Sequence, residues 1–153
     1  MGDDTASDHA QEHRNMAVRL FNRTWELLDD THRTPAQDRE MLGAALGSHY
    51  HWGVVGEERN FAIGDWQVAR VLVELGAVDL AQKFADLALR RAVDGNLGPF
   101  LVGCGHEVLA RVATAKGDKE ARDNHLNRAD DLLSMIDDEE ERDILRADVE
   151  RLR

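Results

Sequence analysis

One stretch of this chain occurs twice, and that duplication limits the possible fold more than any other feature. The first copy covers residues 65–88 and the second covers residues 106–129. Aligning Gly76 with Gly117 gives an offset of 41 residues. The same offset pairs identical residues at four further positions: Ala69 with Ala110, Arg70 with Arg111, Val71 with Val112 and Ala88 with Ala129. A fixed period with a glycine between two apolar-periodic runs is typical of stacked helical hairpins.

The composition also favours helices. Hydrophobic residues make up 42% of the chain and aromatic residues only 5%, which suits helices packed through Ala, Leu and Val. Alternating runs of Val, Ile, Thr and Tyr, which are typical of strands, are absent. At 153 residues the chain is long enough to bury its own core. We therefore predict a single all-α domain over residues 9–153, preceded by a flexible N-terminus over residues 1–8.

Charge and cysteine content limit the partners and the compartment. The formal net charge is −11, which argues against a duplex nucleic acid partner and against docking on an anionic membrane. No apolar run is long enough for a membrane span, and the polar start lacks the core of a signal peptide. The single cysteine, Cys104, has no partner for an internal disulfide. We expect a cytoplasmic protein.

Local signals predict where helices begin and end. Thr34, Pro35 and Gln37 form a strong start signal, with a capping threonine, a proline at the first helical position and a glutamine three residues after the cap. Asp8 and Gln11 predict a similar capping box for the first helix. The expected helices cover residues 9–30, 35–52, 60–75, 78–93, 99–116 and 119–135, and a seventh opens with the acidic run 137–140. Short connections between them predict antiparallel neighbours.

The repeat resembles the tetratricopeptide family. That family places a small residue in the middle of its first helix, a glycine at the turn and two alanines along its second helix. The first copy matches with Ala69, Gly76, Ala81 and Ala88, and the second with Ala110, Gly117 and Ala129. Arg122 stands where the family expects alanine, and the offset of 41 residues exceeds the family's repeat of about 34 residues. The chain is therefore better described as tetratricopeptide-like.

A second resemblance lies in the first half of the chain. Several aromatic and polar positions are similar to those of uncharacterised bacterial proteins of this superfamily: Tyr50, His51, Trp52, Asn60, 64–67 and Arg70. This similarity transfers no particular activity. Together the two resemblances imply an all-α, tetratricopeptide-like stack of about three antiparallel hairpins with a C-terminal capping helix.

The resemblance also implies a binding face, because the first helices of such hairpins line a concave groove. The groove-facing positions carried over to this sequence are Trp66, Arg70 and Glu74 in one copy and Glu107, Arg111 and Ala115 in the next. Adjacent helix axes lie about 8–10 Å apart. Two arginines at that separation are suited to hold one carboxylate or phosphate through paired hydrogen bonds.

A simpler interpretation of the same residues stays open. Glu107 and Arg111 are four residues apart, and on an exposed helix such a pair is an ordinary salt bridge worth a few tenths of a kcal/mol. Trp66 and Arg70 share that spacing, which allows the guanidinium to stack on the indole. Under this interpretation the four residues stabilise helices and bind nothing.

The histidines and the cysteine suggest weaker alternatives. His49 and His51 lie on nearly opposite faces of a helix, so they do not chelate one ion, and His51 with Trp52 becomes a candidate ligand contact. Residues 9–13 match the H-x-x-E-H pattern of a class of zinc peptidases, but no third ligand is evident and chance explains the match better. Cys104 is expected to be a packing residue. We predict no metal and no cofactor.

Three functional hypotheses follow. The leading one is a non-catalytic binding module whose groove recognises an acidic peptide segment or a small anionic ligand. Its predicted ligand-binding residues are His51, Trp52, Asn60, Trp66, Arg70, Glu107 and Arg111. The alternative is a small enzyme or ligand sensor with a polar pocket around most of these residues, closed by the 49–60 segment, in which His51 is the acid/base although no nucleophile is evident. A third is homo-oligomerisation through an apolar groove or an uncapped end of the stack.

Overall fold

The computed structural model describes residues 2–153, with side chains from Thr5 onward, and this part of the chain is all-α. Between Gly2 and Arg153 it contains seven helices and no strand: α1 (Gly2–Asp29), α2 (Pro35–Val55), α3 (Glu58–Glu74), α4 (Val78–Asp94), α5 (Pro99–Lys116), α6 (Lys119–Leu133) and α7 (Glu139–Glu150). The predicted all-α class is confirmed. Across the same residues, no helix has the length and apolar character needed to cross a bilayer.

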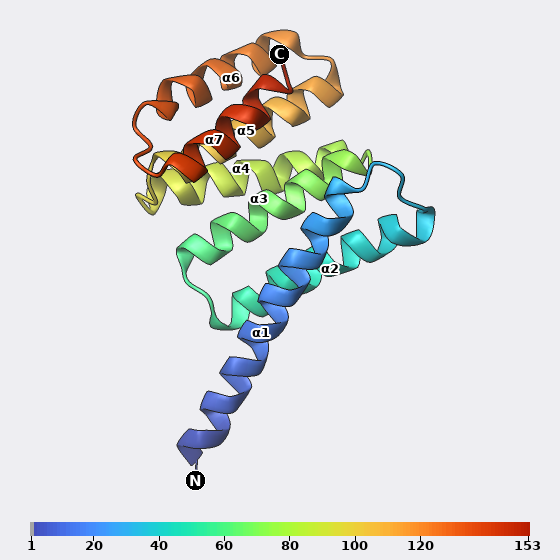
Figure 1. Cartoon of the computed structure of the whole chain (residues 1–153), viewed down its shortest axis with the longest axis vertical. Helices are drawn as coiled ribbons and strands as arrows, with labels where there is room; N and C mark the ends of the chain where they lie inside the picture. Colours follow the sequence, from blue (N-terminus) through green and yellow to red (C-terminus); the bar gives the residue numbers. More distant parts are fainter. Residues whose placement is uncertain (1) are drawn as a thin grey trace.

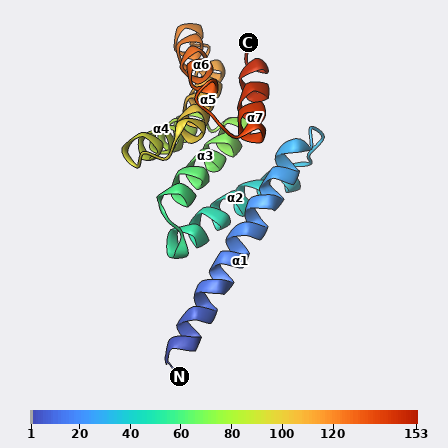
Figure 2. The same ribbon diagram turned by 60° about the vertical axis from the view of Figure 1, so that its left-hand side comes forward.

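Helices that follow one another in the chain pack against one another. The closest pairs are α1 with α2, α3 with α4 and α5 with α6. Contacts of α2 with α3, of α4 with α5 and of α3 with α5 join these pairs, and α7 packs on α5 and α6. Figures 1 and 2 show the pairs succeeding one another from the N-terminal to the C-terminal end, with the first turns of α1 extending beyond the other helices.

The capping box predicted at Thr34 is present and begins α2, whereas the one predicted at Asp8 does not begin α1. The Thr34 hydroxyl accepts a hydrogen bond from the Gln37 backbone N–H at 3.2 Å, and the Gln37 side chain accepts one from the Thr34 N–H at 2.8 Å. The predicted start of the first helix at His9 is wrong, because α1 begins at Gly2 and passes through Asp8 without a break. The Gln11 side chain bonds to Asn15, one turn further along α1.

The two aligned glycines end their helices in the same way. Gly76 follows α3 with a φ of +79°, and Gly117 follows α5 with a φ of +75°. This left-handed conformation is the one that glycine adopts at lowest cost. At both ends the residue after the glycine donates to a carbonyl five residues earlier, Ala77 to Leu72 and Asp118 to Ala113. The sequence repeat is therefore also a repeat of backbone geometry.

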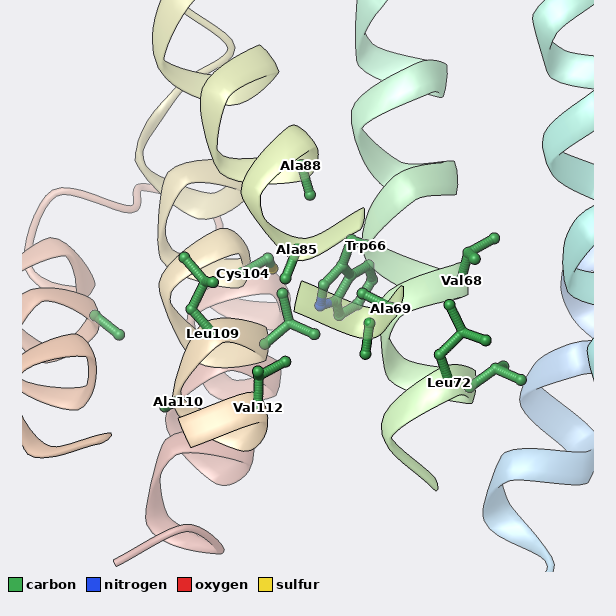
Figure 3. Close-up of a cluster of buried hydrophobic side chains, with 14 of the residues drawn as sticks. Trp66, Val68, Ala69, Leu72, Ala85, Ala88, Cys104, Leu109, Ala110 and Val112 are labelled. Carbon is green, nitrogen blue, oxygen red and sulfur yellow. The ribbon is translucent and has the colours of Figure 1, made fainter. Parts of the chain in front are cut away.

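The small residues of the repeat lie at the helix interfaces. Ala69, Ala88, Ala110 and Ala129 each expose 2% of their surface or less. Such small side chains allow neighbouring helices to approach closely. Figure 3 shows this interior between α3, α4 and α5, where Trp66 and Cys104 accompany the alanines. The expectation that Cys104 is a packing residue agrees with this position.

Two buried polar networks hold the pairs together. Arg33, in the α1–α2 connection, donates to the carbonyls of Leu27 and Asp30 at the end of α1 and forms ion pairs with Asp38 and Glu74. It therefore joins the C-terminal end of α1 to α2 and α3.

The second network centres on Asp65 of α3, which is 1% exposed. One carboxylate oxygen lies 2.7 Å from His49 Nε2 on α2, and the other accepts from Arg91 Nε on α4 at 2.9 Å. A buried carboxylate needs such partners, because burial without them is costly. Of His49 and His51, His49 is therefore the one that contacts a buried group, and its contact with Asp65 is structural.

Candidate functional site

Two helices bring four of the predicted groove residues together. Trp66 and Arg70 belong to α3, Glu107 and Arg111 belong to α5, and these helices are in contact. The Glu107 carboxylate pairs with Arg111, one turn further along α5, and its Oε1 lies 3.6 Å from Arg70 Nη1. Both guanidinium groups are therefore directed at one carboxylate. The other two groove-facing positions lie elsewhere, since Glu74 pairs with Arg33 and Ala115 is exposed.

The Glu107–Arg111 pair differs from an ordinary surface salt bridge. Glu107 is 1% exposed, and the Arg111 side chain is 18% exposed. Removing charges from water is costly, so a buried pair of this kind contributes less net stability than its close contact suggests. The simpler interpretation correctly predicted that Glu107 pairs with Arg111. Its assumption that the pair lies on an exposed helix face was wrong, because Glu107 is buried.

A second carboxylate reaches the same arginines from α7. Asp148 Oδ2 lies 3.6 Å from Arg70 Nη1, and Asp148 Oδ1 lies 3.5 Å from Arg111 Nη2. Two positive and two negative formal charges therefore meet in one cluster, which we call the arginine cluster (Arg70, Arg111, Glu107 and Asp148). Asp148 could not be predicted from the repeat, because α7 lies outside it.

Trp25 of α1 covers the other side of Arg70. The Arg70 guanidinium carbon lies 5.4 Å from the centre of the Trp25 ring, within the range of a cation–π interaction. The Trp25 and Trp66 rings are 5.3 Å apart between centroids. The guanidinium of Arg70, expected to stack on Trp66, lies over the Trp25 ring instead. Trp25 was not among the predicted site residues.

A cleft opens over the arginine cluster. Its volume is about 440 Å³, and its lining residues come from four helices: Trp25, Asp29, Trp66, Arg70, Phe100, Ile144, Asp148 and Arg151. Three aromatic side chains and one isoleucine supply an apolar wall, and two arginines and two aspartates supply charge: Arg70, Arg151, Asp29 and Asp148. Ligand sites of proteins combine apolar walls with a few convergent polar groups in this way.

Unsatisfied hydrogen-bonding groups gather in and beside the arginine cluster, and two of the residues that carry them, Trp66 and Arg70, also line the cleft. Within residues 5–153, four buried side-chain polar atoms lack a hydrogen-bond partner in the protein, and all belong to the predicted site: Trp66 Nε1, Arg70 Nη1, Glu107 Oε2 and Arg111 Nη2. Buried polar groups in native proteins are nearly always hydrogen-bonded. Three of the four atoms are donors, and two of these, Trp66 Nε1 and Arg70 Nη1, belong to residues that line the cleft. Unpaired donors suit a ligand with acceptor oxygens.

Burial changes the proton affinity of the cluster. Loss of contact with water lowers the pKa of Arg70, and the charges of Glu107 and Asp148 oppose that change. Burial likewise raises the pKa of Glu107 against the opposing effect of the two arginines. The neighbouring Cys104 thiol has its pKa raised well above the usual value, chiefly by burial and then by Glu107. Cys104 is therefore a protonated core thiol and not a nucleophile.

The remaining predicted site residues lie in other surroundings. Trp52 and Asn60 line a separate cavity of about 150 Å³ with Val18, Phe21 and Ile63. The Asn60 side chain accepts a hydrogen bond from the Glu57 N–H at 3.0 Å and so caps α3. His51 lies against α1, with its Nδ1 2.7 Å from Nδ1 of His13. The structure therefore unites Trp66, Arg70, Glu107 and Arg111 and places His51, Trp52 and Asn60 apart from them.

The histidines near the N-terminus make pairs. His9 Nδ1 lies 3.6 Å from Glu12 on the exposed face of α1, whereas His13 turns to His51. The two histidines of the H-x-x-E-H match thus have different partners. In the part of the chain that the structure describes, no group of three or more His, Cys, Asp or Glu side chains is arranged to hold a metal ion.

Comparison of the chain with protein-family models, with curated proteins and with solved structures gave no match. The resemblance to tetratricopeptide proteins therefore rests on the repeat positions alone. No relative therefore indicates an activity for this chain.

Proposed function

We propose that this protein is a non-catalytic binding module whose cleft recognises the carboxylate of an acidic peptide segment or of a small anionic ligand. The observation that carries this proposal is the set of unpartnered buried atoms on Trp66, Arg70, Glu107 and Arg111. Trp66 and Arg70 line the cleft, and Glu107 and Arg111 lie next to Arg70 in the arginine cluster. Three of the four atoms are hydrogen-bond donors.

A carboxylate suits these donors better than a neutral group does. The planar guanidinium of arginine presents parallel N–H groups that match the two oxygens of a carboxylate. Trp25, Phe100 and Ile144 line the same cleft, so an apolar group attached to the carboxylate is buried beside it. We therefore expect ligands that join an acid group to an apolar or aromatic portion.

The ligand has to replace Asp148 as an acceptor. The arginine cluster already holds two carboxylates for two guanidinium groups, so a third anion placed beside an unchanged cluster gains little Coulomb attraction. Asp148 stands at distances of 3.5 and 3.6 Å from the arginine nitrogens, beyond the usual hydrogen-bond range of about 2.7–3.2 Å. An external carboxylate that forms these hydrogen bonds therefore competes with it.

We also propose that the helices form a tetratricopeptide-like stack of three hairpins capped by α7. The packing of α1 on α2, α3 on α4 and α5 on α6 supports this arrangement. So does the shared left-handed geometry of Gly76 and Gly117. In such a stack α1, α3 and α5 line the concave side, and each of them contributes a residue to the cleft.

The enzyme hypothesis gains no support from the described contacts. Its proposed acid/base, His51, lies against His13 and Tyr50 and is not among the residues that line the cleft. The thiol of Cys104 is buried and its pKa is raised. A binding role needs neither group.

The proposal is tested by titrating the protein with phenylacetate and, separately, with an acidic hexapeptide of Asp and Glu. The indole N–H signals in ¹⁵N NMR spectra report on each tryptophan. Trp25 and Trp66 line the cleft, whereas Trp52 lines the other cavity. We expect the Trp25 and Trp66 signals to shift with at least one probe and the Trp52 signal to stay in place.

Arg70→Lys is the decisive variant, because lysine keeps the charge but loses the planar fork. We expect the probe to bind Arg70→Lys about tenfold more weakly or worse. Arg23→Lys is the matched control, since Arg23 is an exposed arginine that pairs with Glu26 and Glu40. Equal affinities for Arg70→Lys and Arg23→Lys, or no shift of either cleft tryptophan with either probe, would overturn the proposal.

A further inference from the structure

The last helix, α7, is amphipathic and turns one of its faces toward the cleft. Ile144 and Asp148 are four residues apart and so lie on the same face of α7, and both line the cleft with Trp25, Trp66 and Phe100. Figure 2 shows α7 beside α5 at the C-terminal end of the molecule. The chain thus already contains a helix that presents an apolar residue and then an acid to Arg70 and Arg111.

This internal acid supplies charge but does not complete the hydrogen bonds. The nitrogens that Asp148 approaches, Arg70 Nη1 and Arg111 Nη2, are the same nitrogens that lack a hydrogen-bond partner. Arg151 also directs its Nη1 to Asp148, at 3.4 Å, and so competes for one oxygen. A carboxylate that sits closer to both arginines makes better use of the same site.

Two buried residues and several polar contacts hold α7 in place, including an ion pair of Arg59 on α3 with Glu141. Its buried residues are Leu145 and Val149, and it packs on α5 and α6. Arg142 Nη1 donates to the Ile136 carbonyl at 2.9 Å, and this bond ties α7 to the connection before it. Met135 in that connection is 61% exposed. A helix of 12 residues is marginal without its packing, so α7 keeps its place only as long as it makes these contacts.

We infer that the partner is an acidic amphipathic helix of another protein, which takes the place of α7 against Arg70 and Arg111 and against the walls of the cleft that α1, α3 and α5 supply. Its recognition pattern is an apolar residue followed four positions later by Asp or Glu, as Ile144 and Asp148 show. The inference rests on the proposed carboxylate recognition and specifies its macromolecular ligand. An amphipathic helix laid in an apolar groove is a common mode of peptide recognition, with anchors one turn apart.

The test uses α7 itself as the probe. A fluorescein-labelled synthetic peptide of residues 137–153 is titrated into the full-length chain and into its Asp148→Asn variant, with anisotropy as the readout. In the wild-type chain the tethered α7 competes at an effective concentration on the order of millimolar. Because Asp148→Asn weakens that competitor, we expect the peptide to bind the variant about tenfold more tightly or better.

A control peptide and a second measurement keep the test independent of how the variant folds. The same peptide with Asp148→Asn should lose about tenfold or more in affinity for the Asp148→Asn chain. In the unaltered chain, hydrogen exchange of residues 139–150 is followed while an excess of the acidic peptide is added. We expect exchange of the chain's own α7 to accelerate, since the peptide displaces it.

The outcomes separate this inference from the proposed function. Equal binding of the acidic peptide to both chains, or full protection of the chain's α7 at saturating peptide, overturns the displacement. If phenylacetate still shifts the Trp25 and Trp66 signals in that case, carboxylate recognition stands and only the helical partner is wrong. Tighter binding to Asp148→Asn together with faster exchange of α7 supports both.

Discussion

At the scale of single residues, Gly105 decides how closely α4 and α5 approach. A Cβ atom added at Gly105 would lie 2.9 Å from the Leu89 Cα and 3.0 Å from its Cβ. These atoms belong to the backbone region of α4 and move only if the helices separate. Gly43, in α2, is a contrasting case, because a Cβ atom there meets nothing within 4 Å.

We predict opposite effects of alanine at these two positions. Gly105→Ala should lower the free energy of unfolding by about 1–3 kcal/mol, as overpacking of a tight contact does. Gly43→Ala should raise it by about 0.5–1 kcal/mol, because alanine favours the helix interior. Urea unfolding followed by circular dichroism measures both. A stabilising Gly105→Ala would mean that the two helices lie further apart than described here.

A pair of histidines makes stability depend on pH. His106 Nδ1 on α5 lies 3.0 Å from His125 Nδ1 on α6. Burial, and then the nearby charges of His125 and Arg128, lower the pKa of His106 to about 4. Burial and Arg128 also lower the pKa of His125, while Asp86 opposes that shift. The folded protein therefore keeps these histidines neutral at pH values where the unfolded chain binds protons.

The sign of the effect follows from that difference. Both shifts are downward, so the pair does not change the free energy of unfolding above about pH 6.5, where both states are neutral. As the pH falls from there toward the value of about 4 for His106, the unfolded chain binds more protons and the folded protein loses stability. Because these side chains are partly solvated, we expect a loss of only about 1 kcal/mol between about pH 7.5 and 5.5. Urea unfolding at the two pH values measures the loss, and His106→Asn should reduce it. An undiminished loss in that variant would assign the pH dependence to other groups.

At the scale of elements, Arg33 ends α1 and fixes its angle to the next two helices. Its guanidinium donates to the carbonyls of Leu27 and Asp30 and pairs with Asp38 and Glu74. The side chain is only 9% exposed. Charge-assisted hydrogen bonds to helix-end carbonyls satisfy groups that have no partner within the helix.

Replacing this arginine should be costly. We predict that Arg33→Met lowers the free energy of unfolding by about 2–4 kcal/mol, because it leaves carbonyls and two carboxylates without their donor. Arg39→Met, at an exposed position of α2, should change it by less than about 0.5 kcal/mol. Thermal and urea unfolding provide the comparison. Similar values for the two variants would show that Arg33 does not fix the helix end.

At the scale of the whole molecule, local signals and long-range contacts were predictable to different extents. Helix starts such as Thr34 and the turns at Gly76 and Gly117 depend on a few neighbouring residues, so the sequence predicts them. The offset of the repeat also indicated that Arg70 and Arg111 occupy matching places. Glu107 and Trp66 were predicted with them because all four lie on the first helices of the two copies, α3 and α5.

The rest of the cleft depends on contacts that no periodicity encodes. Asp148 and Trp25 belong to α7 and α1, outside the repeat, and they reach Arg70 only through tertiary packing. His51 was predicted to contact the ligand because it was expected, with Trp52, near the end of the groove. The packing of α2 on α1 turns its ring toward His13 instead. The position of a residue along the chain therefore does not predict which site its side chain joins, because successive helices turn different faces toward one another.

The central claim is that Arg70 and Arg111 together hold a ligand carboxylate. The most direct measurement is a crystal structure of the protein with 4-bromophenylacetate, with the bromine located by its anomalous signal. We predict a bromine peak against Trp25 and Phe100, with the carboxylate within hydrogen-bonding distance of both guanidinium groups and Asp148 moved aside. A bromine peak only at exposed arginines such as Arg23, with the arginine cluster unchanged, would contradict the account.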